Sequence, residues 1–191
     1  MTVIADKTGY VIDPQFPKQI LETLTEQVKE LTYDRSLISG KQRLEDLNSM
    51  EKSHRTSSQC WIPYSSWIAG IMHNLFICAN NEYFHFELNH FDSDIQATRY
   101  EVGQHYGWHT DQFDVGFGRL TRKLSMSLVL DTEFEGGELE LFHPLLHQEL
   151  KYDLKPGQVC IFPSWISHQV QPVTSGIRYS LVAWMNGPEF R

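Results

Sequence analysis

The chain lacks several sequence features that are typical of membrane proteins and secreted proteins. No apolar run approaches the length of a membrane span, and the first residues lack the basic and apolar regions of a secretory signal. Its only cysteines, Cys60, Cys78 and Cys160, are an odd number set among apolar neighbours. That pattern favours buried, reduced thiols over a disulfide framework. We therefore expect a cytoplasmic protein that does not act on a membrane.

Positive charge is also scarce. The 16 Lys and Arg residues are outnumbered by 24 Asp and Glu residues, which gives a formal net charge of −8. Nucleic acids and anionic lipids need a concentrated positive surface, so neither is an expected partner. Arg119, Arg122 and Lys123 form a local exception, and they are interpreted either as a contact for an acidic substrate or as a solvated loop.

The 191 residues suffice for one domain with a substantial core, and no repeat or low-complexity tract interrupts them. Residues 1–95 are expected to supply helical support and the first strands. A helix is predicted after Asp13-Pro14, where apolar residues recur every three or four positions, and a second helix after Pro63. Their apolar positions are Ile20, Leu21, Leu24, Val28 and Leu31 in the first, and Trp67, Ile68, Ile71, Met72, Leu75 and Phe76 in the second.

Residues 96–187 are predicted to form a β-rich core. Short extended runs are separated by turn signals such as Gly136-Gly137 and Pro156-Gly157, which favours a sandwich or jelly roll. The predicted strands are Tyr83–His90, Ala97–Val102, Trp108–Asp111, Lys123–Leu130, Glu138–Phe142, Gln148–Leu154, Gln158–Phe162, His168–Val173 and Ile177–Met185.

His109, Asp111 and the distant His168 are the strongest candidates for chemistry. On a strand, residues i and i+2 project from the same face, so His109 and Asp111 can reach one ion if their segment is extended. His168 lies in a second β-compatible run that the fold can bring close. Two imidazoles and one carboxylate hold non-haem Fe(II) while leaving coordination sites open. His143, His147 and Glu149 could imitate such a site, but Pro144 interrupts their strand and favours a surface loop.

Arg178 lies ten residues beyond His168 in a run of strict alternation. Alternation sends Arg178, Ser180 and Val182 to one face, and an arginine directed into a barrel needs an anion because burying an unpaired guanidinium is costly. A structural ion pair with Glu101 or Asp131 is the alternative interpretation.

These residues occur in a stretch, from about Thr98 to Gly187, that resembles the 2-oxoglutarate- and Fe(II)-dependent dioxygenases of the prolyl/lysyl hydroxylase-like branch. The resemblance implies a double-stranded β-helix in which His109, Asp111 and His168 bind iron and Arg178 pairs with the distal carboxylate of 2-oxoglutarate. Tyr100 and Ser180 resemble further hydrogen-bond donors to that co-substrate. The matching segments are Arg99-Tyr100-Glu101-Val102-Gly103, Leu124 to Leu130, Glu135-Gly136-Gly137-Glu138-Leu139, Lys155-Pro156-Gly157, Phe162-Pro163-Ser164 and His168 to Trp184.

Departures from related branches narrow the expected reaction. Collagen-type prolyl hydroxylases generally have lysine where this chain has Arg178, so peptidyl-proline is not the favoured substrate. The nucleic-acid demethylase branch has a second arginine where this chain has Trp184, and halogenating relatives lack the carboxylate that Asp111 supplies. The resemblance therefore implies hydroxylation of an unactivated C–H bond in a peptidyl side chain, an amino acid or a related small molecule, with release of succinate and CO2.

The implied cofactors are Fe(II), 2-oxoglutarate as co-substrate and O2, with ascorbate as a candidate addition. The segment from Gln112 to Arg122, which combines glycines with Phe113 and Phe117, is a candidate lid over the substrate or a simple exposed connection. Two other functions stay open. One is a cupin-like metalloprotein that does not use 2-oxoglutarate, and the other is a catalytically silent binding module.

Overall fold

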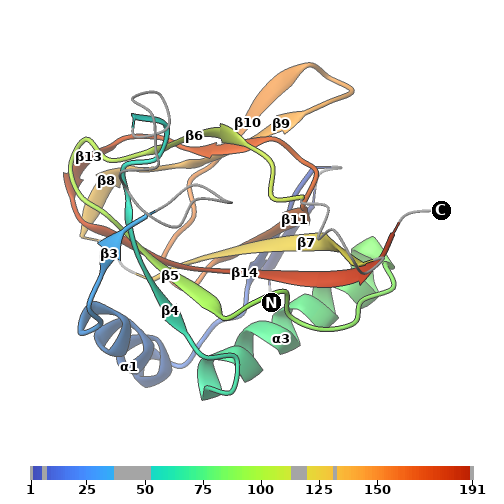
Figure 1. The fold of residues 1–191 in the computed structure, drawn as a ribbon, viewed down its shortest axis with the longest axis horizontal. Helices are drawn as coiled ribbons and strands as arrows, with labels where there is room; N and C mark the ends of the chain where they lie inside the picture. The colour runs from blue at the N-terminus through green and yellow to red at the C-terminus, as the bar shows by residue number, and fades with distance from the viewer. Residues whose placement is uncertain (1, 6–7, 37–52, 113–119, 131–132, 190–191) are drawn as a thin grey trace.

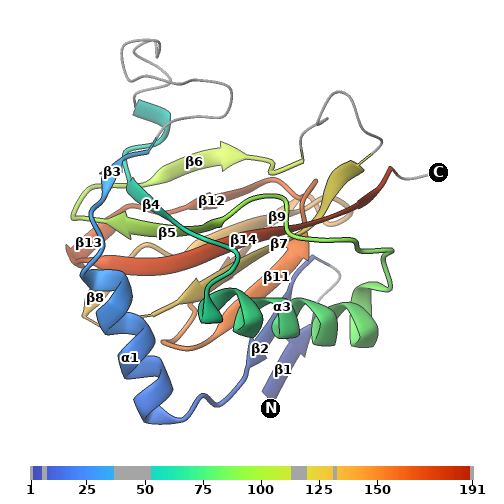
Figure 2. The same ribbon diagram turned by 60° about the horizontal axis from the view of Figure 1, so that its bottom comes forward.

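The computed structural model describes residues 2–5, 8–36, 53–112, 120–130 and 133–189. Two α-helices, α1 (Lys18–Lys29) and α3 (Trp67–Ala79), lie against one face of a large sheet (Figures 1 and 2). Helix α1 buries Leu24 and Val28, and α3 buries a broader apolar face that includes Met72 and Phe76. Both predicted helices are confirmed. None of the helices in the described ranges is long and apolar enough to cross a membrane.

Two main antiparallel sheets form the body of the molecule. The major sheet has the order β1 (Thr2–Ala5), β2 (Tyr10–Asp13), β11 (Val159–Pro163), β7 (Leu120–Val129), β14 (Arg178–Pro188), β5 (Ile95–Tyr100), β4 (Ser58–Ile62) and β3 (Asp34–Arg35). The minor sheet has the order β10 (Gln148–Tyr152), β9 (Leu139–His143), β12 (His168–Val170) and β6 (Tyr106–His109). Strands β13 (Val173–Gly176) and β8 (Phe134–Gly136) form a separate pair.

Strand β14 separates the helix-covered core from the interior between the sheets. Successive side chains of a strand project to opposite faces. Tyr179, Leu181, Ala183 and Met185 belong to the cluster that packs against Leu24, Val28, Met72 and Phe76 of the helices. Val182 and Trp184 face the other way and line a cavity between the sheets. The alternation predicted for this run is therefore confirmed.

Several predicted strands differ from the observed ones. The run Tyr83–His90 is not a strand, because a π-helical turn, η2 (Asn80–Phe84), continues α3 and ends at His85 with φ of 57°. The Asn80 side chain stabilises this exit by accepting from the Phe86 N–H and donating to the Phe86 carbonyl, both at 2.9 Å.

The predicted strand Trp108–Asp111 ends at His109, and the run His168–Val173 divides into β12 and the start of β13. Pro172 lies in this break, and proline has no N–H to continue a ladder. Strands β1, β3 and β4 lie in the first 95 residues, where the first strands were expected, but their positions were not predicted. All three cysteines are free as expected, but only Cys160 is buried, since Cys60 and Cys78 are partly exposed.

Candidate metal centre and cavity

Strand pairing brings the two histidines together. Strand β12 pairs with β6 so that His168 lies opposite His109, and their ring centroids are 4.1 Å apart. Asp111 follows β6 and is fixed from the backbone, because its N–H donates to the Ser164 carbonyl at 2.9 Å. Asp111 thus reaches the histidines from a loop, not from the strand face that its spacing predicts.

Both imidazoles are oriented by a hydrogen bond from Nδ1 to a backbone carbonyl two residues earlier. His109 Nδ1 donates to the Gly107 carbonyl at 2.8 Å, and His168 Nδ1 donates to the Ile166 carbonyl at 3.0 Å. Each ring therefore keeps Nε2 free as a ligand atom. His109 Nε2 lies 3.8 Å from Asp111 Oδ1, and His168 Nε2 lies 3.4 Å from Asp111 Oδ2.

Electrostatics keep these groups in the states that bind a cation. Burial, helped by the neighbouring His168, lowers the pKa of His109 to about 3, so the ring is neutral. Burial by itself would raise the pKa of Asp111, but His168 and His109, together with Trp184 and Arg122, lower that pKa, so the carboxylate is ionised. The three ligand atoms lie within 4.8 Å of one another, and no other group of this kind occurs among the described residues. Two imidazole nitrogens and one carboxylate fit Fe(II).

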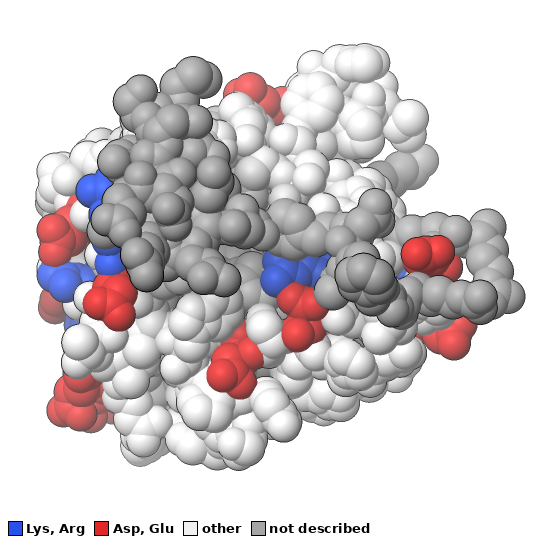
Figure 3. All heavy atoms as spheres, viewed as in Figure 1, with Lys and Arg blue, Asp and Glu red and all other residues white. Residues whose placement is uncertain are grey.

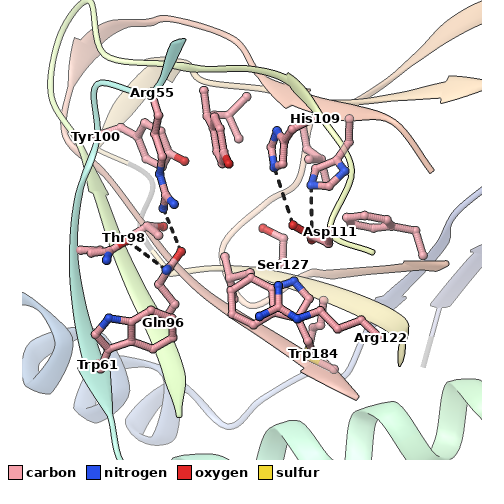
Figure 4. Close-up of a pocket in the computed structure, with 18 residues that line it drawn as sticks. Arg55, Trp61, Gln96, Thr98, Tyr100, His109, Asp111, Arg122, Ser127 and Trp184 are labelled. Atoms are coloured by element: carbon pink, nitrogen blue, oxygen red, sulfur yellow. Dashed lines mark hydrogen bonds and ion pairs between the residues drawn. The ribbon is translucent and has the colours of Figure 1, made fainter. Parts of the chain in front are cut away.

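A cavity of about 410 Å³ opens beside these ligands (Figure 4). Aromatic and aliphatic side chains form much of its wall, including Tyr100, Phe162, Val182 and Trp184. Arg122 stacks on Trp184, with its guanidinium carbon 4.1 Å from the ring centroid, and pairs with Asp92. The predicted cluster of Arg119, Arg122 and Lys123 is thus divided, because Lys123 is buried, Arg122 lines the cavity and Arg119 lies outside the described residues.

Arg178 lies behind the cavity wall. Its side chain is fully buried, its Nη1 donates to Ser180 Oγ at 2.8 Å, and its guanidinium carbon is 5.5 Å from the centroid of the Tyr100 ring. Burial lowers the pKa of Arg178, although an arginine keeps its charge in proteins. In the described part of the chain it has no carboxylate partner, and Glu101 pairs with Arg99 instead. Asp131 lies outside the described residues.

Tyr100 and Ser180 differ in their position relative to the cavity. Tyr100 lines the cavity directly, whereas Ser180 shares its hydroxyl between Arg178 and Thr98 Oγ1, which is 2.6 Å away. Four of the six predicted site residues line the cavity, Arg178 and Ser180 lie behind Tyr100, and the roles of all six stay predictions. The competing residues His143, His147 and Glu149 form no metal-ligand group. Most of the candidate lid, residues 113–119, lies outside the described residues.

Sequence reasoning missed much of the wall nearest the ligands. Arg55 lies in a polar stretch to which no chemistry was assigned, and Tyr106 lies three residues before His109. Gln96 belongs to β5, where alternation with Thr98 and Tyr100 places it on the cavity face. The alternation along β5 was therefore a signal in the sequence that could have placed Gln96 on the cavity wall. Arg55 reaches the site through long-range contacts with Tyr106 and Gln96, which no local pattern reports.

Comparison with known proteins shows what the core of this barrel is similar to. Residues 95–186 match the family model of the 2OG-Fe(II) oxygenase superfamily. This match covers just under half of the chain. A PKHD-type hydroxylase of Synechococcus sp. strain CC9902 is 41% identical over 93 residues, 48% of this chain and 40% of that protein. One from Crocosphaera subtropica is 36% identical over 95 residues, 48% of this chain and 42% of that protein.

The chain thus spans about two fifths of the length of these curated relatives. The fold of the N-terminal half of the chain is also similar to that of solved structures. A Pseudomonas putida prolyl-4-hydroxylase aligns with a TM-score of 0.70 and 21% identity, covering 95% of this chain and 94% of that one. A Trichoplax adhaerens prolyl hydroxylase, solved with a peptide of hypoxia inducible factor, has a TM-score of 0.73 and 16% identity, covering 93% and 83%. The predicted double-stranded β-helix is confirmed.

Proposed function

We propose that this chain is an Fe(II)- and 2-oxoglutarate-dependent hydroxylase. The observation that carries the proposal is the convergence of His109, Asp111 and His168 on one point beside a cavity, with the buried cation Arg178 behind its wall. Bound iron would supply the activation of O2 and 2-oxoglutarate, with release of succinate and CO2. The protein would position both substrates and exclude water.

Each residue has a proposed part in holding these groups. The Nε2 atoms of His109 and His168 and the Asp111 carboxylate would bind Fe(II). Arg178 would pair with the distal carboxylate of 2-oxoglutarate, with Tyr100 and Ser180 as hydrogen-bonding neighbours. The buried charge of Arg178 supports its part, since a guanidinium held without a carboxylate partner among the described residues favours an incoming anion.

The cavity lining supports a neutral or acidic prime substrate. Two arginines, Arg55 and Arg122, line it, while Asp111 is its sole carboxylate among the described residues. A lysyl ammonium would meet like charges there, at a cost in a partly desolvated site. A peptidyl side chain, a free amino acid or a related small molecule is the proposed substrate. The peptide in the Trichoplax structure supports the peptidyl choice, and peptidyl-proline belongs among the candidates because solved prolyl hydroxylases share the fold.

Residues 1–191 are proposed to act as one domain with 96–187 as its catalytic core, in the cytoplasm, where the three free thiols would stay reduced. Nucleic acid is not a proposed partner. On the face shown in Figure 3, acidic and basic side chains are interspersed among uncharged ones. A cupin-like protein that ignores 2-oxoglutarate, or a silent binding module, is less favoured. Neither accounts for the buried Arg178 behind the wall of the cavity that the three candidate ligands line.

The test is an Fe(II)-dependent assay for succinate formed from 2-oxoglutarate. Purified protein would be assayed anaerobically and in air, with and without ascorbate, against peptides and amino acids with prolyl, aspartyl, asparaginyl and lysyl side chains. We expect succinate only with Fe(II) and O2, and none from His168→Ala. Binding of Fe(II) without any binding of 2-oxoglutarate would favour the cupin-like alternative. Absence of binding of both would overturn the proposal in favour of the silent module.

A further inference from the structure

Tyr106 makes the tightest ring contact to either histidine of the metal centre. Its ring and the His109 ring are nearly parallel, with centroids 3.6 Å apart and an interplanar angle of 16°. The separation leaves little sideways offset, so one face of the phenol ring is covered by the imidazole. Two electron-rich rings prefer offset or edge-to-face arrangements, so another interaction must favour this geometry.

Arg55 occupies the opposite face of the same ring. Its guanidinium carbon lies 4.5 Å from the Tyr106 centroid, and the imidazole already covers the other side. Arg55 is itself fixed, because Nη2 donates to Gln96 Oε1 at 2.8 Å and Nε donates to Ser57 Oγ at 3.1 Å. The side chain is buried, so these bonds hold it in a single position.

Gly107 leaves room for the segment that carries His54 and Arg55 to lie close to β6. A Cβ atom at Gly107 would lie 2.7 Å from the His54 ring, so a side chain there would displace that ring, which belongs to the residue before Arg55. The same glycine supplies the carbonyl that accepts from His109 Nδ1. Tyr106 and Gly107 therefore fix the His109 imidazole from two directions, through ring stacking and through a hydrogen bond.

We propose that Tyr106, held by Arg55, is a positioning residue for His109 that fixes the imidazole plane and favours its metal-bound form. An imidazole that donates its lone pair to a divalent cation becomes electron-poor. A positively polarised group over an aromatic face is attracted to it, so the parallel stack becomes favourable on metal binding. The inference rests on the proposed function, because it requires His109 to be a metal ligand.

Co(II) is the probe for the first test, since its absorption spectrum reports both affinity and ligand geometry. Removal of an outer partner of a metal ligand typically weakens metal affinity by about 10- to 100-fold. We expect a loss in this range and an altered spectrum for Tyr106→Leu, a smaller loss for Arg55→Met, and near-wild-type binding for Tyr106→Phe, which keeps the ring. Tyr152→Leu is the matched control, because Tyr152 is a buried tyrosine of the same core cluster outside the metal-ligand group.

The outcomes separate this inference from the proposed function. If the wild-type protein binds no Co(II), or His168→Ala binds it equally well, the proposed function fails. If the wild type binds through the triad but Tyr106→Leu matches it in affinity and spectrum, the positioning inference alone is overturned. Equal losses in Tyr106→Phe and Tyr106→Leu would also overturn it, because the hydroxyl and not the ring would then matter.

A second measurement covers the case in which Tyr106→Leu does not fold. In the wild-type protein loaded with Zn(II), the carbon-bound ring protons of His109 should show an upfield ring-current shift from the stacked phenol, and this shift should persist in Tyr106→Phe. His109 signals at unshifted positions would contradict a stack in the metal-bound state.

Discussion

The two sheets that enclose the cavity contribute to it in different ways. In the minor sheet, β6 and β12 have four and three residues, and the candidate ligands lie at or beyond their ends. Backbone carbonyls of Gly107, Ile166 and Ser164 orient these ligands. In the major sheet, β7 and β14 have ten and eleven residues, and one face of β14 packs against both helices. Ligand geometry therefore depends on a few local hydrogen bonds, whereas stability depends on the long strands.

The largest expected effect tests the minor-sheet half of this comparison. Asp111→Ala should reduce Fe(II)-dependent succinate formation by more than the 10- to 100-fold, roughly, that is typical of outer partners, because a direct ligand is lost. The metal-free protein should melt near the wild-type temperature, since Asp111 contributes no packing to the helix-covered core. Thermal denaturation and the succinate assay provide the two measurements. Asp153→Ala, which removes an exposed carboxylate paired with Lys155, should leave both unchanged.

Arg178→Met tests whether the major sheet also contributes to binding. Loss of one partner of a buried charge pair costs about 2 kcal/mol or more, which is roughly 30-fold in the KM for 2-oxoglutarate. Metal affinity should be retained, and the stability of the metal-free protein should not fall, because a buried guanidinium is replaced by an apolar side chain. Arg178→Lys should recover part of the affinity. An unchanged KM in Arg178→Met, measured beside Arg99→Met as control, would contradict the proposed role.

Local patterns were sufficient to predict the parts of the site that depend on periodicity. The alternation of Arg178, Ser180 and Val182 is a property of one strand, and β14 reproduces it. Helices α1 and α3 follow from apolar residues at three- and four-residue steps. The pairing of His109 with His168 was expected only through family resemblance, because no local rule specifies which strands become neighbours.

The errors occur where long-range contacts override a local preference. Asp111 leaves the strand because its N–H bonds to Ser164 and not to a neighbouring strand. Tyr83 to His90 has a β-compatible composition, yet the Asn80 side chain and the left-handed His85 end a helical turn there. Arg55 could not be assigned to the site, since its bridge to Tyr106 and its hydrogen bond to Gln96 both join residues far apart in the sequence.

Leu181→Ala is expected to lower the stability of the protein and leave binding unchanged, which is the opposite of what is expected for Asp111→Ala. Leu181 is fully buried in the cluster between β14 and the helices, and truncation of such a leucine costs about 2–5 kcal/mol of unfolding free energy. The KM for 2-oxoglutarate and the metal affinity of the folded fraction should stay constant, because the neighbouring Arg178 and Val182 project to the other face. Denaturant unfolding measures the change in unfolding free energy. Leu146→Ala, at a position that is 60% exposed, should change stability little.

Gly137→Ala is the smallest and most selective perturbation, because it acts on Arg178 from the β8–β9 turn. Gly137 has φ of +65°, and a Cβ atom there would lie 2.8 Å from Arg178 Cδ and 3.0 Å from Val173 Cγ2. Backbone strain of this kind costs about 1–3 kcal/mol. Gly103→Ala is the matched control, since its φ is +81° but nothing lies within 4 Å of the added carbon. Both variants should lose stability, and only Gly137→Ala should raise the KM for 2-oxoglutarate, by less than Arg178→Met. Equal KM values in the two glycine variants would mean that 2-oxoglutarate binding does not depend on where the Arg178 side chain lies.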